Sequence, residues 1–534
     1  MTISTSFVYA ALALWAVKKL VDQVSNRKRA PYPPGPKPLP LIGNVLDFPS
    51  SSLAQEYVEW GKKYNSPILH AEALGNHVLI LNNREDAIAL LEQHAKLYSD
   101  RPQMPIFELM GWEFNVELLP YGDEWRQHRR VCQQHFNPQT ARKYEALQMD
   151  KVRGFLQALI ETPEQFDAHN KVLSISLTMN MMYGYDIKSI DDRVIEVAEA
   201  GNVIGSRLMA PGGSLINIFP LLRHIPPWVP GATSHKEAQE VKSLTEEMMR
   251  IPTEFVKKSL ADGTAVSSLV TDFYEKKYSV GASEKEEDII KNIAYTVYGA
   301  ASDTTISASG TFFCQMALNP HIQKRAQEEL DRVVGSKRLP TLDDRKSLPY
   351  LEAIYRELLR FKPPLPLSVP HSLAAEDHHY KGYFIPKAVS ERAMTHDEEA
   401  YPDPFAFKPE RFIDEKGKLN DDDRVLAYGF GRRICVGKSI ASSSLHLKIP
   451  SPSVKVVRNL NRRYMQLWLQ IASVLACFTI EKSRDKDGKE IEIDTTYEES
   501  GLLMMAATTR RKRQFECSFI PRSPAVKKLI LEGI

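Results

Sequence analysis

Apolar and polar residues follow two different periodicities along the chain. From about residue 65 to residue 85 they alternate and include the apolar run Val78–Leu81, which predicts short strands. Tyr121–Phe136 has the spacing of a helix instead. Ser283 and Glu286 match a capping box, and they open a long helical run that ends near Pro320. The pattern therefore predicts both strands and helices, including one unusually long helix.

The N-terminal residues are apolar in a different way. Met1–Val17 carries no charge, and the positive residues Lys18 and Lys19 follow at once. This is the short end of the roughly 17–25 residues that span a bilayer. A cleavable signal peptide carries its positive charge before the apolar run. Charge after the run favours an uncleaved anchor over residues 1–21, with the rest of the chain in the cytosol. A buried or monotopic N-terminal helix is the alternative.

Two proline-rich stretches interrupt the regular pattern. Residues 22–40 are first basic and then rich in proline, which predicts a stiff, extended hinge before a body that spans residues 41–534. Pro211–Gly231 combines prolines and glycines with Leu, Ile, Phe and Trp, so it is apolar but irregular. Such a segment belongs either to the core or to a surface that meets another apolar phase.

Composition narrows the class of protein. The chain has 534 residues, of which 43% are hydrophobic and 25% charged, so a large core is possible. A net charge of +2 favours neither nucleic acid nor a strongly acidic partner. The five cysteines are widely scattered, without Cys-x-x-Cys or Cys/His pairing. We therefore expect neither structural zinc nor a disulfide framework. The cysteine pattern favours a protein of a reducing compartment.

One cysteine stands in an unusual setting. Residues 428–437 read Tyr-Gly-Phe-Gly-Arg-Arg-Ile-Cys-Val-Gly, with Cys435 in a loop of glycines and arginines. Glycine lets the backbone turn tightly and approach a flat object closely. Backbone N–H groups and nearby arginines favour a thiolate. A thiolate in such a loop is a candidate ligand for haem iron. A lone cysteine is otherwise most often a small buried hydrophobe.

This loop resembles the haem-binding signature of the cytochrome P-450 family, with Tyr428 in the position of the usual phenylalanine. Other motifs resemble those of the same family and stand in its order along the chain. They are Trp125-x-x-x-Arg129, Asp303-Thr304, Glu357-x-x-Arg360, Val369-Pro370-His371 and the segment Phe407–Phe412 that contains Arg411. Together with the hinge, the motifs cover roughly residues 30 to 440.

The resemblance implies a role for each of these residues. Cys435 would be the axial ligand of the haem iron, in a loop shaped by Tyr428, Gly431 and Gly437. The side chains expected at the haem propionates are Trp125, Arg129, His371 and Arg433. Thr304 would hydrogen-bond dioxygen and Asp303 would relay protons from solvent. A buried ionic triad behind the loop would consist of Glu357, Arg360 and Arg411.

The resemblance also implies a fold and an activity. The expected fold is mainly α, a triangular helical body with a small β-rich portion behind the N-terminal anchor. The expected reaction inserts one atom of O2 into an apolar organic substrate at haem b. Electrons would come from NADPH through a separate reductase, since no dinucleotide-binding fingerprint is present. Candidates for the docking face are the basic residues Arg126, Arg130, Arg432 and Lys438.

The class implied is microsomal, similar to fungal members of secondary or xenobiotic metabolism. Membership of this class would place the chain at the endoplasmic reticulum membrane, in contact with lipid. Nucleic acid is not an expected partner. In this class Pro211–Gly231 resembles the loop that dips into the membrane over the substrate entrance.

Three segments depart from the family pattern. Residues 387–394 are several residues short and lack a strand pattern, residues 446–467 interrupt a helix with prolines and basic residues, and residues 504–514 replace a shorter turn. The sequence regains the family pattern after each of them. This suggests misjoined exons or a divergent paralogue that binds haem but is catalytically impaired. An O2-independent isomerase or dehydratase is a further alternative, which the pair Asp303-Thr304 disfavours.

Overall fold

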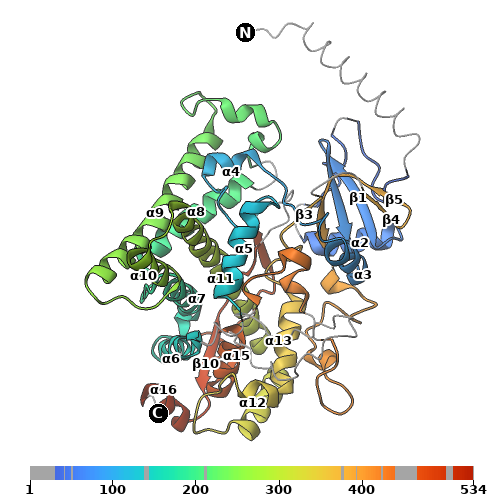
Figure 1. The fold of residues 1–534 in the computed structure, drawn as a ribbon. Helices are drawn as coiled ribbons and strands as arrows, with labels where there is room; N and C mark the ends of the chain where they lie inside the picture. The colour runs from blue at the N-terminus through green and yellow to red at the C-terminus, as the bar shows by residue number, and fades with distance from the viewer. Residues whose placement is uncertain are drawn as a thin grey trace, which may run out of the picture.

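The structure is a computed structural model that describes residues 30–40, 42–49, 52–137, 143–209, 213–373, 378–392, 394–422, 425–438, 466–500 and 509–532. Its helices are α2 (Leu53–Lys63), α3 (Arg84–Ile88), α4 (Pro105–Met110), α5 (Asp123–His135), α6 (Glu145–Glu161), α7 (Phe166–Tyr183), α8 (Arg193–Met209), α9 (Thr233–Ala261), α10 (Leu269–Val280), α11 (Glu284–Leu318), α12 (Pro320–Val333), α13 (Pro349–Phe361), α15 (Gln466–Cys477) and α16 (Pro524–Glu532). Strands β1 to β5 gather on one side with α2 and α3, and the remaining helices form the larger part (Figure 1). The prediction of a mainly helical fold with a small β-rich portion is confirmed.

Helix α11 organises the helical part. Ser283 caps its N-terminus as predicted: the Ser283 hydroxyl accepts the N–H of Glu286, and the Glu286 carboxylate accepts the N–H of Ser283 at 2.9 Å. The first half of α11 packs in a core with α5, α7, α8, α9 and α10. Its second half packs in another core with α6, α12, α13 and α15. Residues 302–305, which include the polar motif, stand where α11 passes from one core to the other.

The strands of the described residues form one larger sheet and three small ones. These strands are β1 (Ile68–Ala73), β2 (Asn76–Leu81), β3 (His371–Ser372), β4 (His378–Tyr380), β5 (Tyr383–Ile385), β6 (Ala388–Arg392), β7 (Phe478–Lys482), β8 (Tyr497–Ser500), β9 (Thr509–Lys512) and β10 (Cys517–Pro521). The larger sheet has the order β1-β2-β6-β3, and the small ones pair β4 with β5, β7 with β10 and β8 with β9. The strands predicted between residues 65 and 85 are thus present as β1 and β2.

The absence of a strand in residues 387–394 was predicted wrongly. Residues 388–392 form β6, which runs parallel to β2 and antiparallel to β3. Strand propensity depends strongly on context. The edges of β2 and β3 that face β6 carry backbone N–H and C=O groups that need hydrogen-bond partners. An extended segment of almost any composition can provide them. The short segment therefore still completes the sheet.

The other unusual segments lie mainly outside the described residues. Residues 446–465 are not described, and α15 begins at Gln466, two residues before the predicted resumption of the helix. Residues 501–508 are not described either, but β9 follows them and pairs with β8. The predicted anchor, residues 1–21, also lies outside the described part. Within the described part, no helix is both long enough and apolar enough to cross a bilayer.

The proline-rich segment lies against the larger sheet. The ring of Tyr32 stacks on His70, with 4.4 Å between ring centroids and 6° between planes. The N–H of His70 donates to Pro34 O at 2.9 Å, and the N–H of Phe384 donates to Pro31 O at 2.8 Å. Nε2 of His70 and Nδ1 of His77 share a hydrogen bond of 2.9 Å. This end of the hinge is therefore held by two backbone hydrogen bonds and by the ring of His70.

This arrangement makes stability depend on pH. Burial, with a smaller contribution from charge repulsion by His77, lowers the pKa of His70 from 6.5 to about 3. As pH falls below 6.5 the unfolded chain binds a proton that the native chain does not. The stabilisation from neutral His70 is thus complete above pH 6.5 and is lost progressively toward pH 3.

Because of His70, we expect the free energy of unfolding to fall by up to about 1 kcal/mol per pH unit as the pH is lowered from 6.5 toward 3. Denaturant unfolding at a series of pH values measures it. His70→Phe keeps a ring under Tyr32 but cannot titrate, so it should flatten the dependence. His321→Gln, at an exposed position of α12, serves as the control. An equally steep dependence in His70→Phe would show that other groups cause it.

Candidate functional site

The cysteine loop is a tight turn that backbone geometry requires to be rich in glycine. Gly429 and Gly431 have φ of 75° and 60°, in the left-handed region that favours glycine. A Cβ on Gly431 would lie 1.9 Å from the carbonyl oxygen of Leu91, so no other residue fits there without movement. The N–H of Cys435 donates to Tyr428 O at 3.0 Å and closes the loop. The loop thus holds Cys435 in one place.

Cys435 differs from the other four cysteines. Its side chain is exposed, whereas Cys132, Cys314, Cys477 and Cys517 are buried. Although exposed, the thiol is surrounded by enough protein that burial raises its pKa, while the N–H groups of Gly437 and Lys438 hydrogen-bond to the sulfur and lower the pKa. The charge of Glu117 also raises the pKa of the thiol, whereas the charge of Arg129 lowers it. An accessible sulfur with two N–H donors is suited to bind a soft cation, which would complete the stabilisation of the thiolate.

Arg433 lies beside the loop with one donor unused. Its Nε donates to Ser99 O and its Nη2 to Leu119 O, both at 2.7 Å, and its guanidinium lies 4.4 Å from the centroid of the Trp125 ring. Nη1 is buried without a hydrogen-bond partner. Burial, together with the charges of Arg101 and Arg129, lowers the pKa of Arg433 to about 8. A buried guanidinium with an unused donor is costly unless an anion pairs with it, so this position is suited to bind a carboxylate.

Arg129 and Arg101 complete a group of three arginines. Arg129 donates from Nη2 to Ile434 O at 2.5 Å, and its Nε is buried without a partner. Arg101, which the sequence reading missed, donates to Val369 O at 3.1 Å and Pro370 O at 2.5 Å. Burial lowers the pKa of both. An isolated arginine in a loop gives no periodic signal, so only the fold identifies Arg101.

His371 lies on β3, directly after the two carbonyls that Arg101 contacts. The side chain is buried, and Nδ1 lies 2.7 Å from Tyr98 O. Since a carbonyl accepts only, Nδ1 carries the proton. The carbonyls of residues 369 and 370 thus connect His371 to the three arginines through Arg101.

The polar motif of α11 is arranged around one hydroxyl. Thr304 Oγ1 donates to Ala300 O, four residues earlier, at 2.8 Å. This contact competes with the regular helical hydrogen bond at the same carbonyl. Asp303 is half-buried, and its charge, after burial, helps to raise the pKa of Tyr298. Ser302 is buried, and its Oγ has no partner. This turn of the helix therefore offers a hydroxyl and a carboxylate next to each other.

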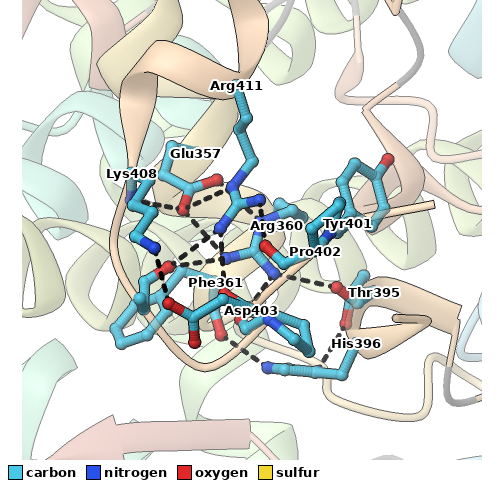
Figure 2. Close-up of polar contacts among 12 residues, drawn as sticks. Glu357, Arg360, Phe361, Thr395, His396, Tyr401, Pro402, Asp403, Lys408 and Arg411 are labelled. Atoms are coloured by element: carbon cyan, nitrogen blue, oxygen red, sulfur yellow. Dashed lines mark hydrogen bonds and ion pairs between the residues drawn. The ribbon is translucent and has the colours of Figure 1, made fainter. Parts of the chain in front are cut away.

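Glu357, Arg360 and Arg411 form one buried ion cluster (Figure 2). Both oxygens of Glu357 accept from Arg360, at 2.7 and 2.9 Å. Oε1 also accepts from Arg411 Nε at 3.2 Å and from the N–H of Lys408 at 2.7 Å. The two guanidinium groups then donate to carbonyls of the segment that follows β6, namely residues 395, 402, 403, 404 and 406. The cluster thus fixes this segment to α13.

The comparisons with known proteins agree with this arrangement. The family model for Cytochrome P-450 matches residues 33–451, so the chain belongs to the cytochrome P-450 family. Its relatives are monooxygenases, which makes it an enzyme of the oxidoreductase class. The chain is 35% identical to the cytochrome P-450 monooxygenase ple1 of Rhodocybe pseudopiperita, over 99% of this chain and 97% of the relative. It is 36% identical to the monooxygenase COX2 of Coprinopsis cinerea, over 98% and 94%. It is 32% identical to the tryptamine 4-monooxygenase of Psilocybe cyanescens, over 94% and 95%.

Proposed function

We propose that this chain is a monooxygenase that binds haem b through Cys435 and inserts one atom of O2 into an apolar small molecule. The observation that carries the proposal is the combination of one accessible, hydrogen-bonded thiol with unpartnered buried arginine donors. The family implies the use of haem and O2, and the residues present fit that group.

The fit rests on charge and donor type. Nε of Arg129 and Nη1 of Arg433 are buried donors without partners, and the two propionates of a haem are carboxylates that would accept from them. The ring of Trp125 contacts Arg433. His371 directly follows the two carbonyls that accept from Arg101, so both residues lie in the region of the arginines. Cys435 would supply the thiolate for the iron. Haem bound here would supply the activation of dioxygen.

Thr304 and Asp303 would deliver protons for the use of dioxygen. In this role Thr304 Oγ1 would give up its contact with Ala300 O and donate a hydrogen bond to dioxygen. Asp303, half-buried, takes protons from solvent and returns them to this hydroxyl. Releasing one atom of O2 as water takes two protons and two electrons, and the electrons come from NADPH through the reductase. A hydroxyl that delivers the protons would therefore couple oxygen use to product formation.

Replacing Thr304 tests this function. With the holoenzyme, NADPH and a reductase, we expect Thr304→Ala to keep consuming NADPH but to release hydrogen peroxide in place of product, with coupling lowered at least about tenfold. Thr304→Ser retains the hydroxyl and serves as the control. Coupling is measured as product formed and peroxide released per NADPH oxidised, with a small apolar compound that the unaltered chain turns over. Unchanged coupling in Thr304→Ala would contradict the role of this hydroxyl.

A separate NADPH–cytochrome P-450 reductase is the proposed electron donor. Arg126, Arg130 and Arg432 are exposed near the cysteine loop. The guanidinium groups of Arg126 and Arg432 each lie 5.5 Å from the centroid of the Tyr121 ring, and Arg432 also donates to the Tyr121 hydroxyl. Lys438 directly follows the loop. A basic surface here would steer an acidic partner toward the cysteine loop.

We propose the endoplasmic reticulum membrane as the location, with the catalytic body in the cytosol. Support comes from the apolar segment between α8 and α9, where Phe219, Leu221 and Trp228 are 58%, 83% and 78% exposed. Large exposed apolar side chains in one segment favour contact with lipid or another apolar partner. The predicted anchor at residues 1–21 would hold the body at the same surface.

A further inference from the structure

Tyr428 makes a contact that phenylalanine, the usual residue of the family at this position, cannot make. Its hydroxyl lies 2.6 Å from the hydroxyl of Tyr355 on α13. Tyr355 is completely buried. A hydrogen bond between two hydroxyls in such surroundings has a fixed geometry, because neither water nor a second rotamer replaces it readily. The first residue of the cysteine loop is thus fastened to the helix that carries Glu357.

Tyr355 is itself held by a second buried ion cluster. Arg345 lies over its ring, with 5.3 Å from the guanidinium carbon to the ring centroid. Arg345 Nε donates to Glu352 at 2.6 Å, and Arg356 Nε donates to the same carboxylate at 3.3 Å. Arg356 also donates to Asp422 O at 2.9 Å, in the segment that leads to the loop. The position of the Tyr355 hydroxyl is therefore well determined.

The main chain of Tyr428 faces the cysteine. Tyr428 O accepts the N–H of Cys435 at 3.0 Å. One residue thus contacts α13 through its hydroxyl and Cys435 through its carbonyl. A shift of the Tyr428 side chain would move this carbonyl, and with it the backbone that carries the sulfur.

We propose that Tyr355 and Tyr428 act as a pair of positioning residues that hold Cys435 in the orientation required for thiolate ligation. This inference rests on the proposed haem-binding function. Neither residue is a catalytic residue, since the pair acts through the backbone of the loop. In this chain the hydroxyl pair connects α13 to the cysteine loop, whereas the ion cluster of Glu357 connects α13 to the segment of residues 395–406.

The test compares Tyr355→Phe, Tyr428→Phe and the double variant as holoenzymes. In the reduced, CO-bound state, the rate at which the red-shifted Soret band converts to a band at shorter wavelength reports loss of thiolate ligation. We expect each single variant to load haem normally and to convert about two- to tenfold faster than the unaltered chain. The double variant should convert no faster than the faster single variant, because only one hydrogen bond is lost.

Tyr350→Phe is the matched control. Tyr350 lies on the same helix and donates its hydroxyl to Glu410 at 2.6 Å, a contact outside the loop. The Tyr350→Phe variant should have a lower thermal stability but an unchanged rate of conversion of the Soret band. If Tyr355→Phe and Tyr428→Phe convert at the rate of Tyr350→Phe, or if their effects multiply in the double variant, the positioning role is wrong. The absence of a red-shifted band in the unaltered chain would instead contradict the proposed function.

Discussion

Cys435→Ser is expected to eliminate thiolate ligation completely. Serine nearly preserves the shape of the side chain and leaves the loop closed by the contact between Cys435 N–H and Tyr428 O. Its hydroxyl is not appreciably ionised and is a hard ligand, so it cannot replace a soft thiolate. The reduced, CO-bound protein should therefore lose the red-shifted Soret band entirely, and with it monooxygenase activity, even where haem still binds through the arginines.

A control separates ligation from general damage to the fold. Cys477 is buried at the end of α15, where it packs as a small apolar side chain. Cys477→Ala should cost some stability but leave the Soret band in place. A red-shifted band that survives in Cys435→Ser would show that another residue binds the iron.

Glu357→Gln should have the second large effect, on folding. The substitution keeps the shape of the side chain but removes the charge shared by Arg360 and Arg411. Glu357 and Arg360 are buried, with side chains 0% and 3% exposed, so water cannot replace the lost charge. Breaking a buried ion pair by removing one partner costs about 3–5 kcal/mol. We expect this loss in the free energy of unfolding, together with a lower yield of haem-loaded protein.

Asp403→Asn provides the comparison with an exposed pair near the same cluster. Asp403 and Lys408 are 59% and 52% exposed, and their ion pair is open to solvent. A solvent-exposed ion pair contributes little to stability, so Asp403→Asn should change the free energy of unfolding far less than Glu357→Gln. Chemical denaturation of both variants measures the difference. A similar small loss in Glu357→Gln would mean that the buried cluster does not stabilise the fold.

Local sequence signals predicted the parts of the fold that local interactions determine. The capping box at Ser283 and Glu286 fixes the start of α11 within one turn, and alternation of apolar residues marks β1 and β2. The same reasoning failed for β6, whose residues have no strand pattern. Partners distant in the sequence, β2 and β3, create that strand.

The candidate site shows the same division. The glycines and the cysteine of the loop are neighbours in sequence, so they can be recognised together. Arg101 and Tyr355 give no such signal, since their importance comes from contacts with residues 268 and 73 positions away. Tyr355 in particular stands in the apolar stripe of α13, where a hydroxyl is not distinguished from a core aromatic until its partner is known.

The most direct test of the central claim is the spectrum of the unaltered chain. The protein is expressed with a haem precursor, reduced and exposed to carbon monoxide. If Cys435 binds the iron as a thiolate, the Soret band will be strongly shifted to the red. Haem that is bound, reduced and CO-ligated without this shift would contradict thiolate ligation and the monooxygenase function proposed from it.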